Sequence, residues 1–286
     1  MANGILIVDK PEGWTSQDVV SKLRGVFHEK RVGHGGTLDP MATGILPVFF
    51  GRATRAVEFF EHAEKAYLAR LRLGTVTDTQ DITGTVLQTN PEQVPEARLR
   101  AVLTQFLGTQ EQIPPMYSAI KIGGKKLYEL ARAGKEVERK SRQITIFSME
   151  LRSFSDGDAE IFVRCSKGTY IRTLCHDIGA ALGCGGCMAA LRRVQAGAYD
   201  RGIPLSEIIA HPQPETLLLP TDSLFAGLPH LTLTENQERC IRNGAAFTCP
   251  QAPQGRCLVY SADGAFLALC ERQDEKLTTV KSFFTP

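Results

Sequence analysis

Hydrophobic side chains recur at helical spacing in two stretches of the N-terminal half of the chain. The first stretch follows Thr15 and Ser16, either of which can act as the N-cap of a helix. The second begins at Pro95, a residue suited to a first helical turn, and stops at Gly108. The positions predicted to face inward are Val19, Val20, Leu23, Val26 and Phe27 in the first helix, and Leu99, Val102, Leu103, Phe106 and Leu107 in the second.

A third helical stripe follows the segment "SKGTY" and ends at Gly183. Its apolar members are Ile171, Leu174, Cys175, Ile178 and Leu182. Thr169 is the predicted N-cap, which places Tyr170 and Arg172 in the first turn. Because Arg172 lies off the apolar stripe, we expect its side chain to face a cleft at the start of the helix.

Alternating hydrophobic and polar positions predict strands elsewhere. The segment "AYLARLRL", from residue 66, places Tyr67 and three further apolar side chains on one face of a strand. Residues 159–165 form a second predicted strand. Since strands and helices intermix without a regular strand–helix–strand repeat, the pattern predicts an α+β fold, a mixed sheet flanked by helices.

Prolines cluster between about residues 210 and 230, which indicates a boundary. We expect a main domain over residues 1–225 and a small β-rich module over residues 229–286. A module of this size has a small core, so we expect it to dock on the main domain.

The module has its own local signals. Thr234 and Gln237 fit a capping box for a short helix that ends before Gly244. A hairpin that turns at Asp263-Gly264 precedes a last strand near residues 277–283.

The composition is that of an ordinary soluble globular protein, with 43% hydrophobic and 22% charged residues. The first residues lack the features of a signal peptide, and no stretch is apolar for long enough to span a bilayer. Eight scattered cysteines favour a reducing compartment, so we expect a cytoplasmic protein. Cys184 and Cys187 lack the second pair of a zinc site and the context of a redox motif, which favours small residues at a helix–loop boundary.

The net charge of +2 argues against a generally polycationic nucleic-acid binder, but basic residues gather in one segment. Residues 121–142 hold eight Lys or Arg against three Glu. Such a cluster can bind phosphates through charge and counterion release, and a solvated surface arm is an equally good interpretation. Residues 229–286 carry six basic and six acidic side chains, so the C-terminal module is not basic.

The stretch "GHGGTLDPMATGILPV", from Gly33, raises the question of why one carboxylate stands in so restricted a place. Asp39 lies between Leu38 and Pro40, after three glycines and a histidine and before an apolar run. Aspartate before proline commonly forms a turn, and composition alone favours that interpretation. The alternative is a nucleophile or acid/base group held at the rim of a pocket.

Several familiar catalytic motifs are absent from the sequence, among them the G-x-S-x-G elbow, the G-x-x-x-x-G-K-[ST] phosphate loop and H-E-x-x-H. The histidines and acidic residues show no metal-ligand spacing, and "GHGG" lacks the strand and helix of a dinucleotide site. We therefore expect no metal and no cofactor. Asp39, Tyr67, Tyr170 and Arg172 remain as candidates, since an aspartate can act as a nucleophile toward an anomeric carbon.

Five segments, in order, resemble successive motifs of the TruB family, the bacterial tRNA pseudouridine-55 synthases. They are "GILIVDKPEGWTS", "KRVGHGGTLDPMATGILPVFFGRATR", "KAYLARLRLGTVTDTQDITG", "IPPMYSAIKIGGKKLYELARAGKEVER" and "VRCSKGTYIRTLCHDIG" with the later "LRR". The resemblance covers nearly all of residues 4–195, and the tail from about 229 more loosely resembles a small PUA-type RNA-binding barrel. The resemblance to the TruB family implies a largely antiparallel mixed sheet in the main domain.

The resemblance implies roles for three residues in catalysis. Asp39 occupies the position of the catalytic aspartate, Arg172 that of the arginine that pairs with it, and Tyr67 that of the tyrosine that stacks on the target base. An arginine a few ångströms away would favour the ionised form of Asp39 in a dry pocket. Attack on ribose C1′, addition to uracil C6 and removal of a sugar proton all remain open as its role.

Further residues are implied as parts of the same site. Tyr170 and Leu191 match pocket residues, and His34 matches the histidine that helps to hold the flipped-out nucleotide. Lys10 and Pro11 fall in the first motif, where a structural role for Lys10 is the better interpretation.

The implied reaction converts one uridine of the tRNA T-loop to pseudouridine without a cofactor. The implied partner is the T-arm of tRNA, with no membrane and no obligate protein partner, and a monomer suits binding to one tRNA arm. Two alternatives stay open: an RNA-binding or RNA-folding module in which Asp39 is not used chemically, and a family member that acts on another RNA.

Overall fold

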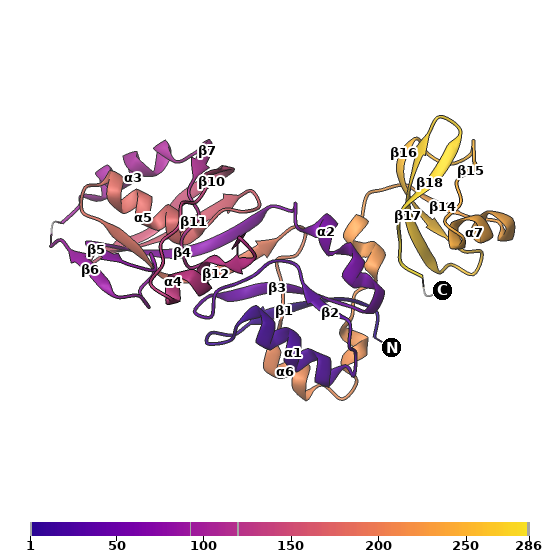
Figure 1. Cartoon of the computed structure of the whole chain (residues 1–286), viewed down its shortest axis with the longest axis horizontal. Helices are drawn as coiled ribbons and strands as arrows, with labels where there is room; N and C mark the ends of the chain where they lie inside the picture. Colours follow the sequence, from indigo (N-terminus) through magenta and orange to yellow (C-terminus); the bar gives the residue numbers. More distant parts are fainter. Residues whose placement is uncertain (1, 92, 119, 285–286) are drawn as a thin grey trace.

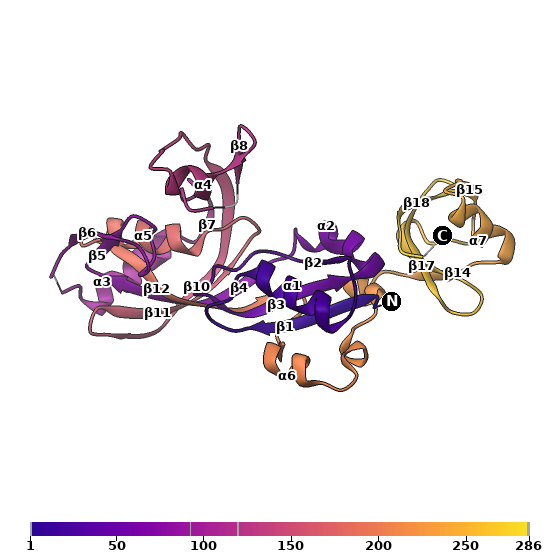
Figure 2. The ribbon, with the colours of Figure 1, turned by 60° about the horizontal axis from the view of Figure 1, so that its bottom comes forward.

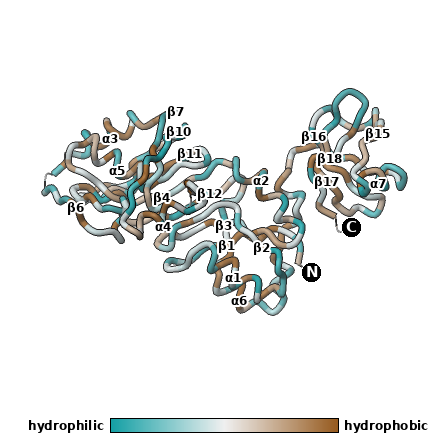
Figure 3. The backbone as a smooth tube through the Cα atoms, in the orientation of Figure 1, coloured by the Kyte–Doolittle hydropathy of each residue, from teal (hydrophilic) through white to brown (hydrophobic). Residues whose placement is uncertain are grey.

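The computed structural model describes residues 2–91, 93–118 and 120–284, and for Lys121, Lys126 and Arg132 the backbone alone. Figure 1 shows an elongated molecule in which a long twisted sheet with its helices is joined to a small β-rich part that carries the C-terminus. Figure 3 shows hydrophobic stretches in each part. One buried cluster packs on one face of the sheet, a second joins the other face to the small part, and a third lies within the small part.

Nine strands of the described residues form the main sheet, which is mixed and largely antiparallel, as predicted. In spatial order they are β13 (Ile203–Pro204), β1 (Gly4–Lys10), β3 (Thr43–Phe50), β12 (Gly186–Ala196), β4 (Lys65–Leu73), β11 (Asp158–Cys165), β10 (Arg142–Ser155) and β7 (Gly108–Gln112), with β2 (Val32–His34) also paired to β3. The β1–β13 and β3–β12 pairings are parallel. Tyr67, Ala69, Leu71 and Leu73 of β4 are buried in one core cluster, which confirms the predicted alternation.

Helices cover the two halves of the sheet separately (Figure 1). Beside β1 lie α1 (Ser16–Val26) and α6 (Leu205–Ala210), and the turn η1 (Gly51–Ala56) and α2 (Val57–Phe60) follow β3. The other half carries α3 (Glu96–Gln105) and α5 (Ile171–Ala181). No helix within the described segments has both the length and the hydrophobicity that a bilayer span requires.

The predicted helices are found, with two corrections at their ends. Thr15 is the N-cap of α1, and its hydroxyl accepts a hydrogen bond from Asp18 N at 3.0 Å. The stripe of α3 was predicted to include Leu107, but the helix ends at Gln105 and Leu107 is 46% exposed. A residue beyond the last turn no longer follows the helical period, so its side chain is free to leave the core.

The second correction concerns the start of α5, because Thr169 is not its N-cap. The capping position is Tyr170, and the Thr169 hydroxyl donates to Ser166 O. Gln112, at the end of β7, binds both backbone groups of Tyr170 in place of a local cap. Its Oε1 accepts from Tyr170 N at 2.8 Å, and its Nε2 donates to Tyr170 O at 3.1 Å.

Two excursions leave the main sheet. A small ribbon of β5 (Thr75–Thr77) and β6 (Val86–Thr89) follows β4, and the segment between β7 and β10 holds β8 (Lys121–Ile122), β9 (Lys125–Lys126) and α4 (Leu127–Arg132). Figure 2 shows the α4 and β8 region projecting from one face of the sheet. This projection contains most of the basic segment predicted from the sequence.

After the turns η2 (Pro214–Leu217) and η3 (Thr221–Phe225), the C-terminal part forms its own curled five-stranded sheet in the described residues. The order is β14 (His230–Thr232), β16 (Gly255–Tyr260), β17 (Phe266–Gln273), β18 (Lys276–Ser282) and β15 (Phe247–Thr248), with α7 (Glu235–Arg242) packed beside it. The predicted hairpin at Asp263-Gly264 joins β16 to β17, and Thr234 N donates to Gln237 Oε1 at 3.0 Å in the predicted capping box.

All eight cysteines lie in the described residues and are free. Both Cys184 and Cys187 are buried; Cys184 lies in the turn after α5, near the predicted helix–loop boundary, whereas Cys187 lies within β12.

Candidate active site

A cavity of about 460 Å³ opens beside β4 and β12, where the two halves of the main sheet meet. Its volume lies within the range of small-molecule and cofactor sites. Its walls come from the loop after β2, from β4, from Tyr117, Ser118 and Tyr128, from the entrance to α5 and from β12. The cavity therefore collects side chains from segments that are far apart in the sequence.

The loop that carries Asp39 is pinned on both sides of that residue. Leu38 N donates to the Ser16 hydroxyl at 2.8 Å, which anchors the loop to the first turn of α1. On the other side, Pro40 O accepts from Gly13 N at 2.8 Å and from Lys10 Nζ at 3.3 Å. The carboxylate is thus held by backbone contacts that leave its oxygens toward the cavity.

Two of the glycines before Asp39 are required by packing or by backbone conformation. A Cβ on Gly35 would lie 2.5 Å from the ring of Phe60, so this glycine permits core packing. Gly36 has φ +124°, a conformation that side chains disfavour. Gly33 has open space around it.

Asp39 and Arg172 form the predicted pair. Arg172 Nε lies 3.0 Å from Asp39 Oδ2, and Arg172 Nη2 lies 3.4 Å from Asp39 Oδ1, an arrangement in which the guanidinium faces both oxygens. The Arg172 side chain is 6% exposed, whereas that of Asp39 is 36% exposed. Tyr117 O accepts from Arg172 Nη2 at 2.7 Å and fixes the guanidinium further. The aspartate is therefore paired and still accessible from the cavity.

A second carboxylate, which the sequence did not reveal, lies on the far side of the same guanidinium. Asp81 Oδ2 is 3.6 Å from Arg172 Nη1, and the Asp81 side chain is 7% exposed. Thr79 O also accepts from Arg172 Nη1, at 3.3 Å. Asp81 comes from the loop between β5 and β6, where no periodicity marks it, so only the folded chain brings it to Arg172.

The environment raises the pKa of Asp39, mainly because burial disfavours the charged carboxylate. Arg172 opposes this effect and Asp81 adds to it. Arg172 thus favours the ionised form, as expected, but the loss of hydration on burial outweighs its effect on the pKa. Asp39 thus resembles a tuned acid/base or nucleophilic group more than a simple surface ion pair.

Tyr67 forms part of the cavity wall, with 9% of its surface exposed. Burial raises the pKa of its phenol, so the side chain is neutral. Arg193, its register partner on β12, lies beside it and is 1% exposed, with Nε donating to Ile45 O at 2.6 Å and Nη2 to Gly36 O at 3.2 Å. Arg193 ties the loop before Asp39 to the central strand.

Arg193 was also missed in the sequence, although a signal was present. Leu191 and Arg193 are two residues apart on β12 and both line the cavity. Arg192 points the other way and pairs with Asp9, its Nη2 at 2.6 Å from Asp9 Oδ2. Strand alternation from Leu191 therefore would have selected Arg193.

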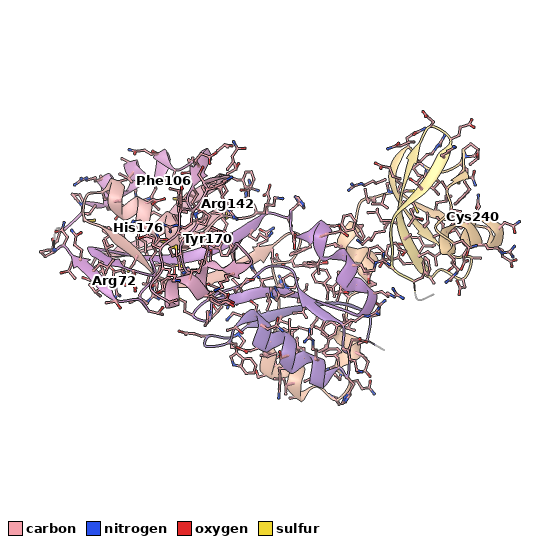
Figure 4. The ribbon with its side chains drawn as sticks, in the orientation of Figure 1. Arg72, Phe106, Arg142, Tyr170, His176 and Cys240 are labelled. Carbon is pink, nitrogen blue, oxygen red and sulfur yellow. The ribbon has the colours of Figure 1, made fainter. Side chains whose placement is uncertain are left out.

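The remaining predicted residues separate into two groups. Tyr170 and Leu191 line the cavity, and the Arg142 guanidinium carbon lies 5.6 Å from the centre of the Tyr170 ring (Figure 4). His34 is not among the described residues that line it: its Nδ1 accepts from Gly36 N at 3.4 Å. Burial lowers the pKa of His34, which leaves a neutral ring that braces the loop.

Lys10 is fully buried, and its ammonium donates to Pro11 O at 2.9 Å, to Trp14 O at 2.6 Å and to Pro40 O. These contacts connect the end of β1 to the turn next to Asp39. They agree with the structural role expected for Lys10.

The described residues contain no group of three His, Cys, Asp or Glu side chains arranged to hold a metal ion. The expectation that the protein uses neither metal nor cofactor remains a prediction.

Comparison with known proteins agrees with this architecture. A solved structure, the crystal structure of a Cbf5–Nop10–Gar1 complex, has the same fold: the superposition covers 99% of this chain and 85% of that one, with a TM-score of 0.75 and 24% identity. Another, the archaeal box H/ACA sRNP Nop10–Cbf5 complex, gives a TM-score of 0.72 over 99% of this chain and 86% of that one, at 25% identity. The fold is therefore that of a pseudouridine synthase.

Sequence comparison narrows this class. The model of the TruB family pseudouridylate synthase N-terminal domain matches residues 24–171, and that of the tRNA pseudouridylate synthase B C-terminal domain matches residues 172–226. The tRNA pseudouridine synthase B of Azoarcus sp. (strain BH72) is 43% identical, over 97% of this chain and 93% of its own length. That of Oenococcus oeni is 42% identical, over 96% and 95%. The chain belongs to the TruB family, and it isomerises uridine to pseudouridine in tRNA.

Proposed function

We propose that the chain acts on one uridine of the T-loop of tRNA, uridine 55, with Asp39 as the catalytic carboxylate. The observation that carries this proposal is the contact of Asp39 with Arg172 at 3.0 Å in a cavity walled by Tyr67 and Tyr170. A base in this cavity lies beside a carboxylate that is paired, partly exposed and tuned by burial.

The reaction is a rearrangement within one nucleotide. The C1′–N1 bond of uridine breaks, the detached uracil turns, and a C1′–C5 bond forms. The proton on C5 leaves to solvent and N1 gains one, so that no oxidant, reductant or energy source is consumed. The ionised Asp39 supports one step of this sequence as nucleophile or base, and Arg172 stabilises its charge until the base is in place.

The target uridine must leave the stacked loop before it can enter the cavity. Extrusion of a base costs a few kcal/mol, and an aromatic platform returns about 1–3 kcal/mol per base. We assign this platform to Tyr67, with Tyr170 and Leu191 as further walls. His34 braces the loop that holds Asp39, and we propose that it supports the flipped nucleotide from there.

The projection between β7 and β10 supplies both cavity walls and positive charge. Tyr117 and Tyr128 line the cavity, while Lys125, Lys135 and Lys140 are exposed nearby in the chain. The side chains of Lys121, Lys126 and Arg132, which also belong to the predicted basic cluster, lie outside the described part of the structure. We propose that this projection binds the phosphates of the T-arm.

We further propose that residues 1–225 form the catalytic domain and residues 229–286 a PUA-like RNA-binding module, and that a cytoplasmic monomer binds one tRNA arm without an obligate protein partner or a cofactor. Eight free cysteines suit a reducing compartment.

The decisive experiment measures tritium release from T-arm RNA labelled at C5 of uridine, for wild type and Asp39→Asn at matched RNA occupancy. Because C5 loses its hydrogen only when the new bond forms, the label reports chemistry and not binding. We expect release by wild type alone, unaffected by a metal chelator. Release by both proteins would remove Asp39 from the mechanism; binding without release by either would indicate another target RNA or a protein that binds or folds tRNA.

A further inference from the structure

The loop between β5 and β6 (Figure 1) contains Asp81, whose carboxylate is bound from within the loop. One oxygen of this group, Oδ1, accepts hydrogen bonds from the Thr79 hydroxyl at 2.9 Å, from the Thr83 hydroxyl at 2.5 Å and from Thr83 N at 3.0 Å. The other oxygen, Oδ2, lies 3.6 Å from Arg172 Nη1. The hydroxyl donors therefore occupy one side of the carboxylate and leave the other for the arginine.

The backbone of the same loop is fixed as firmly as the side chain. Gln80 has φ +64°, a left-handed conformation that is uncommon for a residue with a side chain. Its carbonyl accepts from Met188 N on β12 at 3.0 Å, and its side-chain Oε1 accepts from the Thr173 hydroxyl on α5 at 2.8 Å. Thr173 directly follows Arg172, so the loop is joined to the helix that carries the arginine.

Arg172 is consequently held from two directions. Asp39 and Tyr117 O bind its Nε and Nη2, and the loop offers Thr79 O and Asp81 Oδ2 to its Nη1. If the Asp81 carboxylate could rotate freely, it could bind the Arg172 guanidinium in several orientations. Only some of these orientations would direct the guanidinium toward Asp39. A misplacement of about 1 Å in such a site can cost about 100-fold in rate.

We infer that the hydroxyl groups of Thr79 and Thr83 are positioning groups of the active site: they fix the rotation of the Asp81 carboxylate, which in turn orients Arg172 toward Asp39. This inference rests on the proposed function, in which Asp39 performs the chemistry. Neither threonine is among the described residues that line the cavity, and the two hydroxyl groups act on Arg172 through Asp81. The network thus extends the active site to a loop remote from the target base.

The test compares Thr79→Val/Thr83→Val, which removes the donors and keeps the shape, with Thr79→Ser/Thr83→Ser, which keeps the donors. Thr89→Val, on exposed β6 of the same ribbon, is the matched control. Each protein is assayed by single-turnover tritium release at saturating enzyme over a range of pH, with RNA affinity and thermal midpoint measured alongside. The valine and serine pairs are also made in an Asp81→Ala background.

We expect the valine pair to slow release by about 10–100-fold at neutral pH with unchanged RNA affinity. Because a loosely held guanidinium lowers the pKa of Asp39 less effectively, the acidic limb of the rate profile should move to higher pH. The serine pair and Thr89→Val should match wild type. In the Asp81→Ala background the valine pair should cause no further loss, since its route of action is already removed.

Two results would overturn the inference. A valine pair within about twofold of wild type at every pH would show that the hydroxyls are not needed. An equal loss with and without Asp81, accompanied by a lower thermal midpoint, would show a general effect on the fold. Failure of wild type itself to release tritium would instead overturn the proposed function, so the two failures are distinguishable.

Discussion

At the scale of single residues, Asp39 is subject to opposing influences that set its charge. Burial raises its pKa and Arg172 lowers it. If Asp39 must be ionised to act, the rate falls as pH drops through this raised pKa, which lies above that of an ordinary aspartate. We predict that Arg172→Met moves the acidic limb of the single-turnover rate to still higher pH and slows the reaction by about 100-fold or more at neutral pH.

Single-turnover tritium release as a function of pH checks this prediction. Arg192→Met is the matched control for Arg172→Met. Arg192 also pairs with an aspartate, Asp9, but it lies on the face of β12 opposite to Arg193 and the cavity. An unmoved acidic limb in Arg172→Met would mean that the limb does not report Asp39.

Lys10 allows a prediction about stability, because burial lowers its pKa from 10.5 to about 8. Between these two pH values the unfolded chain binds a proton at Lys10 that the folded chain has lost, so the free energy of unfolding gains a contribution that rises with pH. Lys10→Met should remove this rise. It should also destabilise the fold at pH 7 by about 2–4 kcal/mol, since it leaves buried carbonyls unpaired.

Urea unfolding of wild type and Lys10→Met at about pH 7 and about pH 9.5 measures both effects. Lys65, whose pKa burial also lowers to about 8, titrates in both proteins, so their difference isolates Lys10. A constant difference between the two proteins at both pH values would contradict the prediction.

At the scale of elements, helix α5 depends on close contact with the turn that leads into β12. A Cβ on Gly179 would lie 2.2 Å from Gly186 N and 2.3 Å from Gly185 C, which are backbone atoms that cannot give way cheaply. We predict that Gly179→Ala displaces α5, destabilises the fold by about 1–3 kcal/mol and slows catalysis through Arg172.

Gly25, in α1, is the matched position, because nothing lies within 4 Å of its added Cβ. Gly25→Ala should stabilise the protein by about 0.5–1 kcal/mol through helix propensity alone. Thermal melting should therefore show a lower stability for Gly179→Ala and a higher stability for Gly25→Ala. Single-turnover assays measure the loss of rate in Gly179→Ala. Equal destabilisation would show that the backbone contact at Gly179 is not the cause.

The same elements show which features the sequence could predict. The alternation in β4 and the stripe in α5 are local, and the structure confirms both. The cap of α5 is not local, since Gln112 lies 58 residues before Tyr170. Asp81 is likewise joined to Arg172 only by folding, while the pairing of Asp39 with Arg172 was predicted through resemblance and not from any spacing.

At the scale of the whole molecule, an aromatic cluster joins the C-terminal part to the main sheet. Phe225 lies 5.4 Å from Phe59 and 6.0 Å from Phe283, measured between ring centres, and Leu258 and Leu269 share this buried cluster with β1 and β3. We predict that deleting residues 229–286 weakens tRNA binding more than it slows single-turnover release, because the described residues that line the cavity all lie between Gly35 and Arg193.

The deletion would also uncover Phe225, so the shortened chain should carry Phe225→Ser to limit aggregation. We expect the thermal midpoint of the shortened chain to fall. Full-length Phe225→Ala is the control, since it loosens the interface while keeping the module. A large loss of release at saturating enzyme in the shortened chain, beyond that of the control, would show that the C-terminal part takes part in the chemistry.

The central place of β12 has a consequence for how the protein is made. This strand, residues 186–196, lies between β3 and β4, although β3 ends at residue 50 and β4 at residue 73. During synthesis on the ribosome, β1 can pair with β3 and β4 with β11 as separate antiparallel sheets, each left with an open edge until β12 emerges. Asp39 belongs to the first of these pieces and Tyr67 to the second. The active centre therefore comes into existence in one late step, when a single strand closes the gap between two earlier-formed halves.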